Sequence, residues 1–448
     1  MKKNIFLILI LLFFLVTRLY KIASIPSSVY WDEASIGYNA YSVLKTGRDE
    51  WGEFLPLHFR AFGEFKLPVY IYSVLIVELV FGLTQFAVRF PAVIYGLFSV
   101  LGLYLLTNKI TKNKTVALLS SFLFSLTPWF FIFSRTGYEA VAGLVFFIFA
   151  IYFLLLSFEK NRNLIISIFL FISAIYSYNS FRILTPIFLI PGLIVFGFKT
   201  RRQGVLVLLI SVGLFILSLL PIYKLYSQDS GLNRLQTVKA TQSVIKNYLT
   251  HLSFDFLFIK GDSNPRSQIP QSPELFLIDL PFIVLGLFYI FKKRSLKYYA
   301  ILATLLVSFI PAAITKESPH ALRSILAAPI FAVITSLGVF SFISFFKKYS
   351  KYLLAAIVSL YLIYFGSYFY KFITKYNLLT STDWQYQYKL IFANQKEGLV
   401  TDKYAQPYIF ALFYLKYPPE RFRETVKYNS VDKWGFSLVS SFDDFQFK

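Results

Sequence analysis

The 448-residue chain contains no cysteine and only three histidines. The lack of cysteine excludes disulfide bonds and every metal site that needs a thiolate ligand. The histidines are His58, His251 and His320, and because no motif ties them together they are weak evidence for a metal site. No cofactor is indicated with certainty, and a divalent metal ion stays an open alternative.

Local catalytic motifs are also absent. The sequence has no glycine-rich phosphate loop, no HExxH helix and no nucleophile elbow. Acidic residues number 23 against 45 basic residues, which gives a net charge of +22. The basic residues lie in short clusters between hydrophobic runs and not in a stripe with stacking aromatic residues. Nucleic acid is therefore not the expected partner.

Hydrophobic residues make up 56% of the chain, and the mean hydropathy is +0.59. A soluble domain would contain only ~45–50% apolar residues, so the sequence predicts an all-α polytopic protein of the cell membrane, surrounded by membrane lipid. About twelve runs approach the ~20 residues that a spanning helix needs. They lie at 5–25, 67–83, 91–107, 115–133, 140–158, 164–178, 183–198, 204–225, 275–291, 298–314, 323–346 and 352–370. The first run favours a retained helix over a cleaved signal, because its apolar character continues to Ile25 without a clear small-x-small site.

Clusters of lysine and arginine predict which connections are cytoplasmic. These clusters lie at 109–114, 160–162, 199–202, 292–297 and 347–351. Nearly all acidic residues fall in the other connections, which we expect outside the cell. Those connections comprise long segments at 26–66, 226–274 and 371–448 and short ones at 84–90, 134–139, 179–182 and 315–322. Long loops are uncommon unless they are functional, so the active site is expected on the extracytoplasmic side.

The chain divides into a transmembrane domain, 1–370, with external loops at 26–66 and 226–274, and a small extracytoplasmic domain, 371–448. In the first loop, Ser35 to Leu44 is amphipathic and predicts a short interfacial helix. In the last segment, 398–400 is typical of a strand and Pro407 to Tyr417 of a helix that begins with proline. The last segment is therefore predicted to be a small α/β appendage.

The acidic pair Asp32-Glu33 lies just past the first hydrophobic run. Charges are costly in hydrocarbon, so these carboxylates should face water or a polar cavity, as the catalytic edge of a membrane enzyme would. The alternative is that they only complement the positive end of a helix dipole, and both interpretations can hold together.

Further ionisable residues lie at the predicted external ends of other runs, where folding would bring them around one cavity: Lys66, Arg89, Arg135, Glu139, Arg182, His320 and Arg323. Each has a simpler interpretation. Arginine and lysine at a span end are often interfacial anchors, and Glu139 before an apolar run would complement a helix N-terminus.

Three segments carry a family resemblance when taken in order: Trp31-Asp32-Glu33, Lys66-Leu67-Pro68-Val69-Tyr70 and Phe86-Ala87-Val88-Arg89-Phe90-Pro91-Ala92. Over residues 1–200 the chain resembles the GT-C membrane glycosyltransferases, in the glycosyltransferase family 39-like branch of protein O-mannosyltransferases and lipid A aminoarabinose transferases. This resemblance implies a GT-C-like helical fold, a polyprenyl-phosphate-linked sugar as donor, an acid in the first loop acting on the acceptor, and basic residues that receive the phosphate. Leu67 departs from the usual Lys-Pro-Pro pattern.

The resemblance implies catalytic roles for Asp32 and Glu139 and a donor-phosphate role for Lys66 and Arg89. We add Glu33 as a second acid in the pair, and extend the phosphate-binding set to Arg135, Arg182 and Arg323. Should these residues be anchors, the loop with Lys260, Asp262 and Arg266 is the alternative phosphate site.

The predicted activity is transfer of a sugar to an acceptor hydroxyl of protein, lipid or glycan, through an inverting displacement in which the acid takes the hydroxyl proton. A lipid-linked sugar transporter or flippase and a glycan polymerase or ligase are the alternatives. A transporter would place charges through the depth of the bilayer, whereas an enzyme of this type would gather them on one face.

Overall fold

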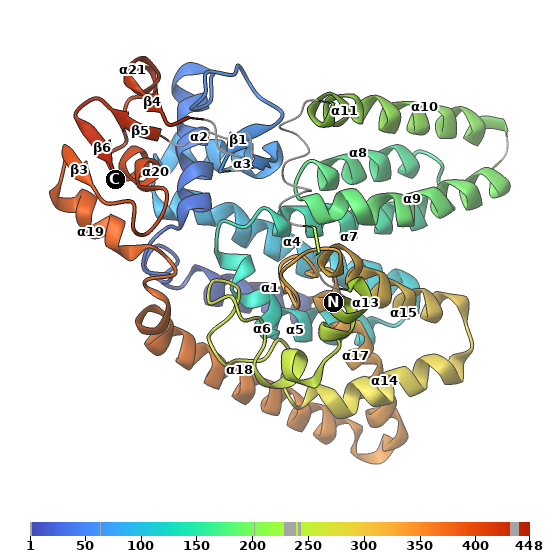
Figure 1. The fold of residues 1–448 in the computed structure, drawn as a ribbon. Coiled ribbons are helices and arrows are strands. Elements are labelled where there is room, and N and C mark those ends of the chain that lie inside the picture. Colours follow the sequence, from blue (N-terminus) through green and yellow to red (C-terminus); the bar gives the residue numbers. More distant parts are fainter. Residues whose placement is uncertain (1, 63, 201, 228–238, 241–242, 431–438) are drawn as a thin grey trace.

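The computed structural model describes residues 2–62, 64–200, 202–227, 239–240, 243–430 and 439–448. Helical structure occupies each of the twelve predicted hydrophobic runs. The helices are α1 (Lys2–Leu19), α3 (Pro68–Phe81), α4 (Gln85–Thr111), α5 (Lys114–Leu126) with α6 (Pro128–Phe131) and η1 (Phe133–Arg135), α7 (Ala140–Ser157), α8 (Asn163–Ile175), α9 (Asn179–Lys199), α10 (Arg202–Ser218) with α11 (Leu220–Tyr226), α14 (Asp279–Lys293), α15 (Leu296–Ser308) with α16 (Ile310–Ala313), α17 (Ala327–Phe345) and α18 (Ser350–Thr380). Figure 1 shows these helices packed as one bundle.

Seven helical segments within the described residues are long and apolar enough to cross a membrane. They are Gln85–Thr111, Ala140–Ser157, Asn179–Lys199, Gln203–Tyr226, Leu296–Ala313, Ala327–Phe345 and Lys347–Thr380. A further pair, α5 with α6 and η1, meets the same test but bends by 67° at Thr127. The multi-pass, mostly helical character is confirmed, whereas the count of about twelve spans is not.

The run at 67–83 forms a helix too short for the test that the seven segments pass. Helix α3 has 14 residues, which gives it a length of about 21 Å against the ~30 Å of a bilayer core. Tyr70, in its first turn, donates to the carbonyl of Val88 in the first turn of α4 at 2.9 Å, and only three residues join the other end of α3 to α4. Both ends of α3 therefore lie level with the start of α4. The sequence assigned the flanking connections, 26–66 and 84–90, to one side, which fits a helix that does not cross.

The first loop contains α2 (Trp31–Thr46) and an antiparallel hairpin of β1 (Phe59–Ala61) and β2 (Glu64–Lys66). The helix predicted over 35–44 is confirmed, but it is covered by protein on most sides and is not an open interfacial helix. A Cβ atom on Gly37 would lie 2.7 Å from Val88 and 2.8 Å from Phe413. The absence of a side chain at Gly37 thus lets α2 fit between α4 and the C-terminal segment.

The C-terminal segment forms the expected α/β unit. It contains α19 (Tyr386–Asn394), β3 (Gly398–Val400), α20 (Pro407–Tyr414), α21 (Pro419–Thr425), β4 (Lys427–Tyr428), β5 (Val439–Phe442) and β6 (Phe445–Phe447). The strand order is β3-β6-β5-β4, with β3 parallel to β6 and the other pairs antiparallel. Figure 1 shows this unit, in orange and red, beside α2 and β1.

The proposed division at residue 371 stays a prediction, and α18 runs through that position to Thr380. The loop predicted at 226–274 contains α13 (Val244–Thr250) and a π-helical turn, η2 (Asp255–Ile259). Residues 228–238 and 241–242 of this loop, and 431–438 of the tail, lie outside the described residues.

The placement of α3 can be tested with single cysteines, since the chain has none of its own. We expect a membrane-impermeant thiol reagent to label Glu53→Cys and Thr84→Cys from the same side of sealed vesicles, and Lys112→Cys from the opposite side. The reason is that Glu53 and Thr84 flank a helix that stays at one surface, whereas Lys112 follows the long span α4. Labelling of Glu53→Cys and Thr84→Cys from opposite sides would show that α3 crosses.

Candidate active site

A polar cavity of about 420 Å³ lies where several separate parts of the chain meet. It brings together four of the predicted site residues, Asp32, Lys66, Glu139 and Arg323, together with His320. The other lining residues are Tyr30, Trp31, Phe62, Phe65, Leu67, Tyr138, Ser177, Tyr178, Asn179, Asn264, Arg266, Ser267, Glu317, Leu322 and Gln406. Three carboxylates, three permanent cations and several aromatic rings therefore share one space.

Asp32 and Lys66 form an ion pair in the wall of this cavity. Lys66 Nζ lies 2.6 Å from Asp32 Oδ1, and the exposed fractions of the Lys66 and Asp32 side chains are 3% and 25%. Asp32 belongs to the first turn of α2, where the helix dipole favours a negative charge. Lys66 is placed by the hairpin, in which it pairs with Phe59. Asp32 is thus a carboxylate that a substrate can reach, and Lys66 orients it.

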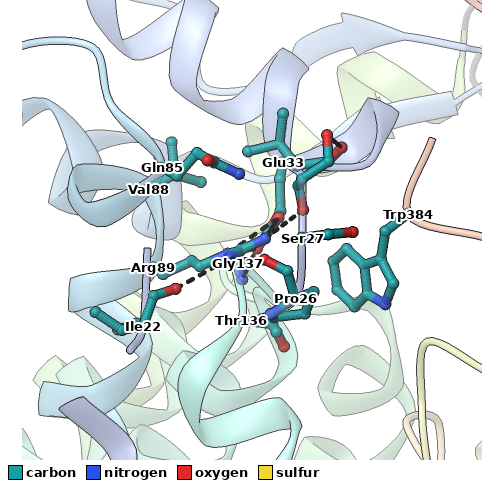
Figure 2. A network of polar contacts seen from close by, with 12 residues as sticks. Ile22, Pro26, Ser27, Glu33, Gln85, Val88, Arg89, Thr136, Gly137 and Trp384 are labelled. Carbon is teal, nitrogen blue, oxygen red and sulfur yellow. Dashed lines mark hydrogen bonds and ion pairs between the residues drawn. The ribbon is translucent and has the colours of Figure 1, made fainter. Parts of the chain in front are cut away.

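The neighbouring acid Glu33 points the other way, into the protein (Figure 2). Arg89 Nη2 lies 2.9 Å from Glu33 Oε2, Arg89 Nε lies 3.0 Å from Glu33 Oε1, and both side chains are fully buried. The backbone N–H of Gly137 also donates to Glu33 Oε1, at 2.6 Å. A Cβ atom on Gly137 would lie 2.9 Å from Glu33 Cγ, so glycine allows this approach. Glu33 is therefore a structural ligand of Arg89 and does not line the cavity.

Arg89 uses its remaining donors to hold the chain that follows α1. Its Nη1 donates to the carbonyls of Ile22 at 2.9 Å and Pro26 at 3.0 Å, and its Nη2 donates to the carbonyl of Ser28 at 2.5 Å. The ring of Trp384 lies 5.5 Å from the guanidinium carbon, and Figure 2 shows the ring beside this network. Arg89 thus binds protein groups, and it is not among the residues that line the cavity.

Arg135 and Arg182 also lie away from the cavity. Arg135 is fully buried and donates to the carbonyls of Thr17, Tyr20 and Ile25 at 3.3, 2.9 and 2.9 Å. Arg182 donates to the carbonyl of Ile175 and to the hydroxyl of Tyr226, and it lies 3.4 Å from a ring nitrogen of His58. Burial, followed by the nearby Arg182 charge, lowers the pKa of His58 to about 4. Sequence position alone could not separate these arginines from those at the cavity.

Arg266 is the cavity cation that the sequence offered only as an alternative. Its guanidinium carbon lies 5.1 Å from the ring of Tyr30 and 5.3 Å from the ring of Trp31. The loop is held in place by Asp262, whose Oδ2 accepts from the backbone N–H of Ala321 at 2.7 Å. Burial raises the pKa of Asp262 to about 6. Because Arg266 meets Tyr30 and Trp31 from a distant part of the chain, no local pattern could have revealed the contact.

The C-terminal unit holds the start of α2 through Gln385. Its Oε1 accepts from the backbone N–H of Trp31 at 3.0 Å, and its Nε2 donates to the carbonyls of Ala405, at 3.0 Å, and Tyr404. Gln406, from the same unit, lines the cavity. The unit therefore supports the residue that immediately precedes Asp32, a role that the sequence did not predict.

No group of three or more His, Asp or Glu suited to a metal ion occurs within the described ranges. His320 Nδ1 lies 3.9 Å from Asp262 Oδ2, and the backbone N–H of His320 donates to His251 Nε2 at 3.0 Å. His251 thus accepts a hydrogen bond that fixes one wall of the cavity. His58 lies with Arg182, away from the other two histidines.

Comparison with known proteins supports the fold suggested by the sequence. Residues 66–223 match the family model described as dolichyl-phosphate-mannose-protein mannosyltransferase. A search of curated protein sequences finds no match.

Solved structures resemble a larger part of the chain than the family model does. ArnT from Cupriavidus metallidurans in the apo state has a TM-score of 0.60 at 12% identity, over 93% of this chain and 84% of its own. ArnT bound to undecaprenyl phosphate gives a TM-score of 0.56 at 12% identity, with the same coverage. The Archaeoglobus fulgidus oligosaccharyltransferase AglB, in complex with an inhibitory peptide and a dolichol-phosphate, gives 0.57 at 14% identity, over 92% of this chain and 64% of its own.

These likenesses show that this chain has a GT-C-like fold. The fold implied by the resemblance of the first 200 residues is thereby confirmed, and the family model matches within the same part of the chain. The chain spans 64% of the length of the oligosaccharyltransferase.

The different environments of the two neighbouring acids predict different effects on stability. Glu33→Gln should lower the free energy of unfolding by about 3–5 kcal/mol, because Arg89 would be left as an uncompensated buried cation. The measurement is denaturant unfolding in detergent, with the exposed Glu53→Gln as the matched control. Equal stability of the two variants would contradict a structural role for Glu33.

Proposed function

We propose that this protein is an integral membrane glycosyltransferase that moves a sugar from a polyprenyl-phosphate donor to an acceptor hydroxyl. The observation that carries the proposal is the cavity in which the accessible carboxylate of Asp32 faces the same space as Lys66, Arg266 and Arg323. A base and a group of phosphate-binding cations are the two things that this displacement needs.

In the proposed reaction, the acceptor oxygen attacks the anomeric carbon while Asp32 takes the hydroxyl proton. The new carbon–oxygen bond forms as the bond from the anomeric carbon to the phosphate oxygen breaks. The bonding electrons remain on the polyprenyl phosphate, which leaves as an anion. A single displacement of this kind inverts the anomeric centre and needs no covalent sugar–carboxylate intermediate.

Lys66 and Arg266 are the proposed donor-phosphate ligands. Lys66 is a point charge beside Asp32, and Arg266 offers a planar fork that can bind two phosphate oxygens. Arg323 donates to Thr315 Oγ1 at 2.8 Å and to Glu317 Oε2 at 3.2 Å, so its charge is already partly engaged. We take Lys66 and Arg266 as the principal phosphate contacts because Lys66 lies directly beside Asp32, and Arg266 lies near the rings of Tyr30 and Trp31, which precede Asp32 in the chain.

Glu139 remains in the proposed site as a carboxylate for the sugar or acceptor hydroxyls. It lies in the cavity wall immediately before α7, whereas Asp32 lies on α2. Aromatic rings in the same wall, including Tyr138 and Tyr178, offer flat apolar surfaces for a sugar ring.

The related structures support the donor class. Among them, ArnT is bound to undecaprenyl phosphate, and AglB is in complex with a dolichol-phosphate. We place the reaction on the extracytoplasmic side, because Lys109 and Lys112 lie at the end of α4 opposite to the cavity.

A transporter is less well supported. Helices α7 and α17, which lie at the centre of the bundle, have no lysine, arginine, aspartate or glutamate in their sequences. A pathway for a charged headgroup through the bilayer would be expected to place such residues along its length. The ionisable residues of the cavity gather instead at one end of the helices.

Replacement of the proposed base gives the most specific test of the reaction. Asp32→Asn should remain folded, because Asp32 is partly exposed, but its turnover should fall at least ~10²-fold through loss of the general base. The measurement is mass spectrometric detection of released polyprenyl phosphate and of glycosylated product from the reconstituted protein. Glu53→Gln is the control, and near-normal transfer by folded Asp32→Asn would refute the assignment.

Basic residues that line the cavity and a basic residue outside it should differ in their effect on the KM for the donor. Lys66→Gln and Arg266→Gln should each raise the KM for the donor by about 10- to 100-fold, which corresponds to the ~1.5–3 kcal/mol of a charged hydrogen bond. Arg182→Gln should leave this KM unchanged, because Arg182 lies outside the cavity. Titration of a polyprenyl-phosphate sugar against the three variants tests this difference. An equal effect of all three replacements would argue against a phosphate site at Lys66 and Arg266.

A further inference from the structure

Residues 244–259, in the connection between α11 and α14, present an apolar face away from the protein. Ile245 is 73% exposed and Leu249 is 58% exposed, although both belong to the short helix α13. We call this surface the outer face of 244–259, and it consists of Val244, Ile245, Leu249, Leu252, Phe254 and Ile259. A loop in water would be expected to turn such side chains inward.

Two polar side chains of the same segment, Asn247 and His251, point into the protein. Asn247 is only 4% exposed, and its Nδ2 donates to the carbonyls of Ala313 and Thr315 at 3.1 Å each. His251 is fully buried, with its Nδ1 2.8 Å from the carbonyl oxygen of Asn247 and its Nε2 accepting from the backbone N–H of His320. Asn247 and His251 are thus paired with protein groups, while the six apolar side chains of the outer face are exposed, which suits an apolar surrounding.

The depth of the segment follows from its contact with a membrane span. The hydroxyl of Tyr248 donates to the carbonyl of Leu306 at 2.8 Å. Leu306 precedes the end of the span Leu296–Ala313 by seven residues, which corresponds to about 10 Å along a helix. Leu306 is itself exposed on the flank of that span, so the outer face of 244–259 continues a surface that contacts lipid.

We infer that residues 244–259 insert into the membrane leaflet on the cavity side, with their outer face among the lipid acyl chains. The partner of this surface is therefore the lipid bilayer itself. Lys246 can extend its charge towards the headgroups, as long basic side chains do at interfaces. Asp255 and Lys260 pair at 2.8 Å, which reduces the cost of placing either charge near the apolar layer.

Hydrogen bonds connect the inserted segment to one wall of the cavity. Ser318 Oγ donates to the carbonyl of Asn247 at 2.9 Å, and His251 accepts from the backbone of His320, which lines the cavity. The membrane thus supports this wall through residues 247–251. The placement of residues 244–259 in the bilayer does not depend on the proposed transfer reaction.

The absence of native cysteine allows a direct test with nitroxide labels on single cysteines. Ile245→Cys and Leu249→Cys would be labelled in the full chain, reconstituted in lipid nanodiscs, and compared with Lys403→Cys on the exposed surface of the C-terminal unit. The ratio of collisions with oxygen to collisions with a water-soluble nickel chelate should be several-fold higher at 245 and 249 than at 403. Equal ratios at the three positions would overturn the inference.

A second position protects the test against a local folding defect. Phe254 belongs to the same outer face, and Phe254→Cys should give the same high ratio as the two α13 positions. The thermal midpoint of each labelled variant identifies a protein that remains folded. A nickel-accessible label at Phe254 in a folded protein would contradict insertion of the segment as a whole.

Discussion

The buried ion pair between Glu33 and Arg89 fixes the geometry of the chain at the cavity end of the helix bundle. Arg89 holds both the carboxylate of Glu33 and the carbonyls of residues 22, 26 and 28, so α4 fixes the chain between α1 and α2. Gly137 then brings the turn before α7 to the same carboxylate. The orientation of Asp32 follows from this geometry. Because Glu33 is bound inside the protein by Arg89, the side chain of Asp32 faces the cavity. A buried pair is costly to desolvate, and its several hydrogen bonds offset that cost.

The cavity is assembled from parts of the chain that have little local stability of their own. A hairpin of two three-residue strands positions Lys66, and a loop tied by Asp262 positions Arg266. Gln385 joins the C-terminal unit to the first residue of α2. The residues that line the cavity lie on several short segments. The walls of such a cavity can differ between relatives while the fold stays the same.

Much of the helical architecture could be predicted from hydrophobic run length, and the position of Asp32 from the cost of a charge beside a membrane span. The run at 67–83 forms a helix of only 14 residues whose two ends lie near the start of α4, which composition could not predict because it reports apolarity but not the direction of a helix. The basic residues at span ends look alike in sequence, yet Arg89 and Arg135 bind backbone carbonyls while Lys66 faces the cavity. Arg266 and Gln385 reach the site through long-range contacts, for which a single sequence contains no local signal.

The proposed function requires a lipid phosphate to bind between Lys66 and Arg266, beside Asp32. The most direct measurement is a high-resolution cryo-EM structure of the protein in nanodiscs with a polyprenyl phosphate. We expect phosphate density within hydrogen-bonding distance of Lys66 Nζ and the Arg266 guanidinium, with the Asp32 carboxylate facing the position of the sugar. Phosphate density at Arg182, or at another site away from the cavity, would contradict it.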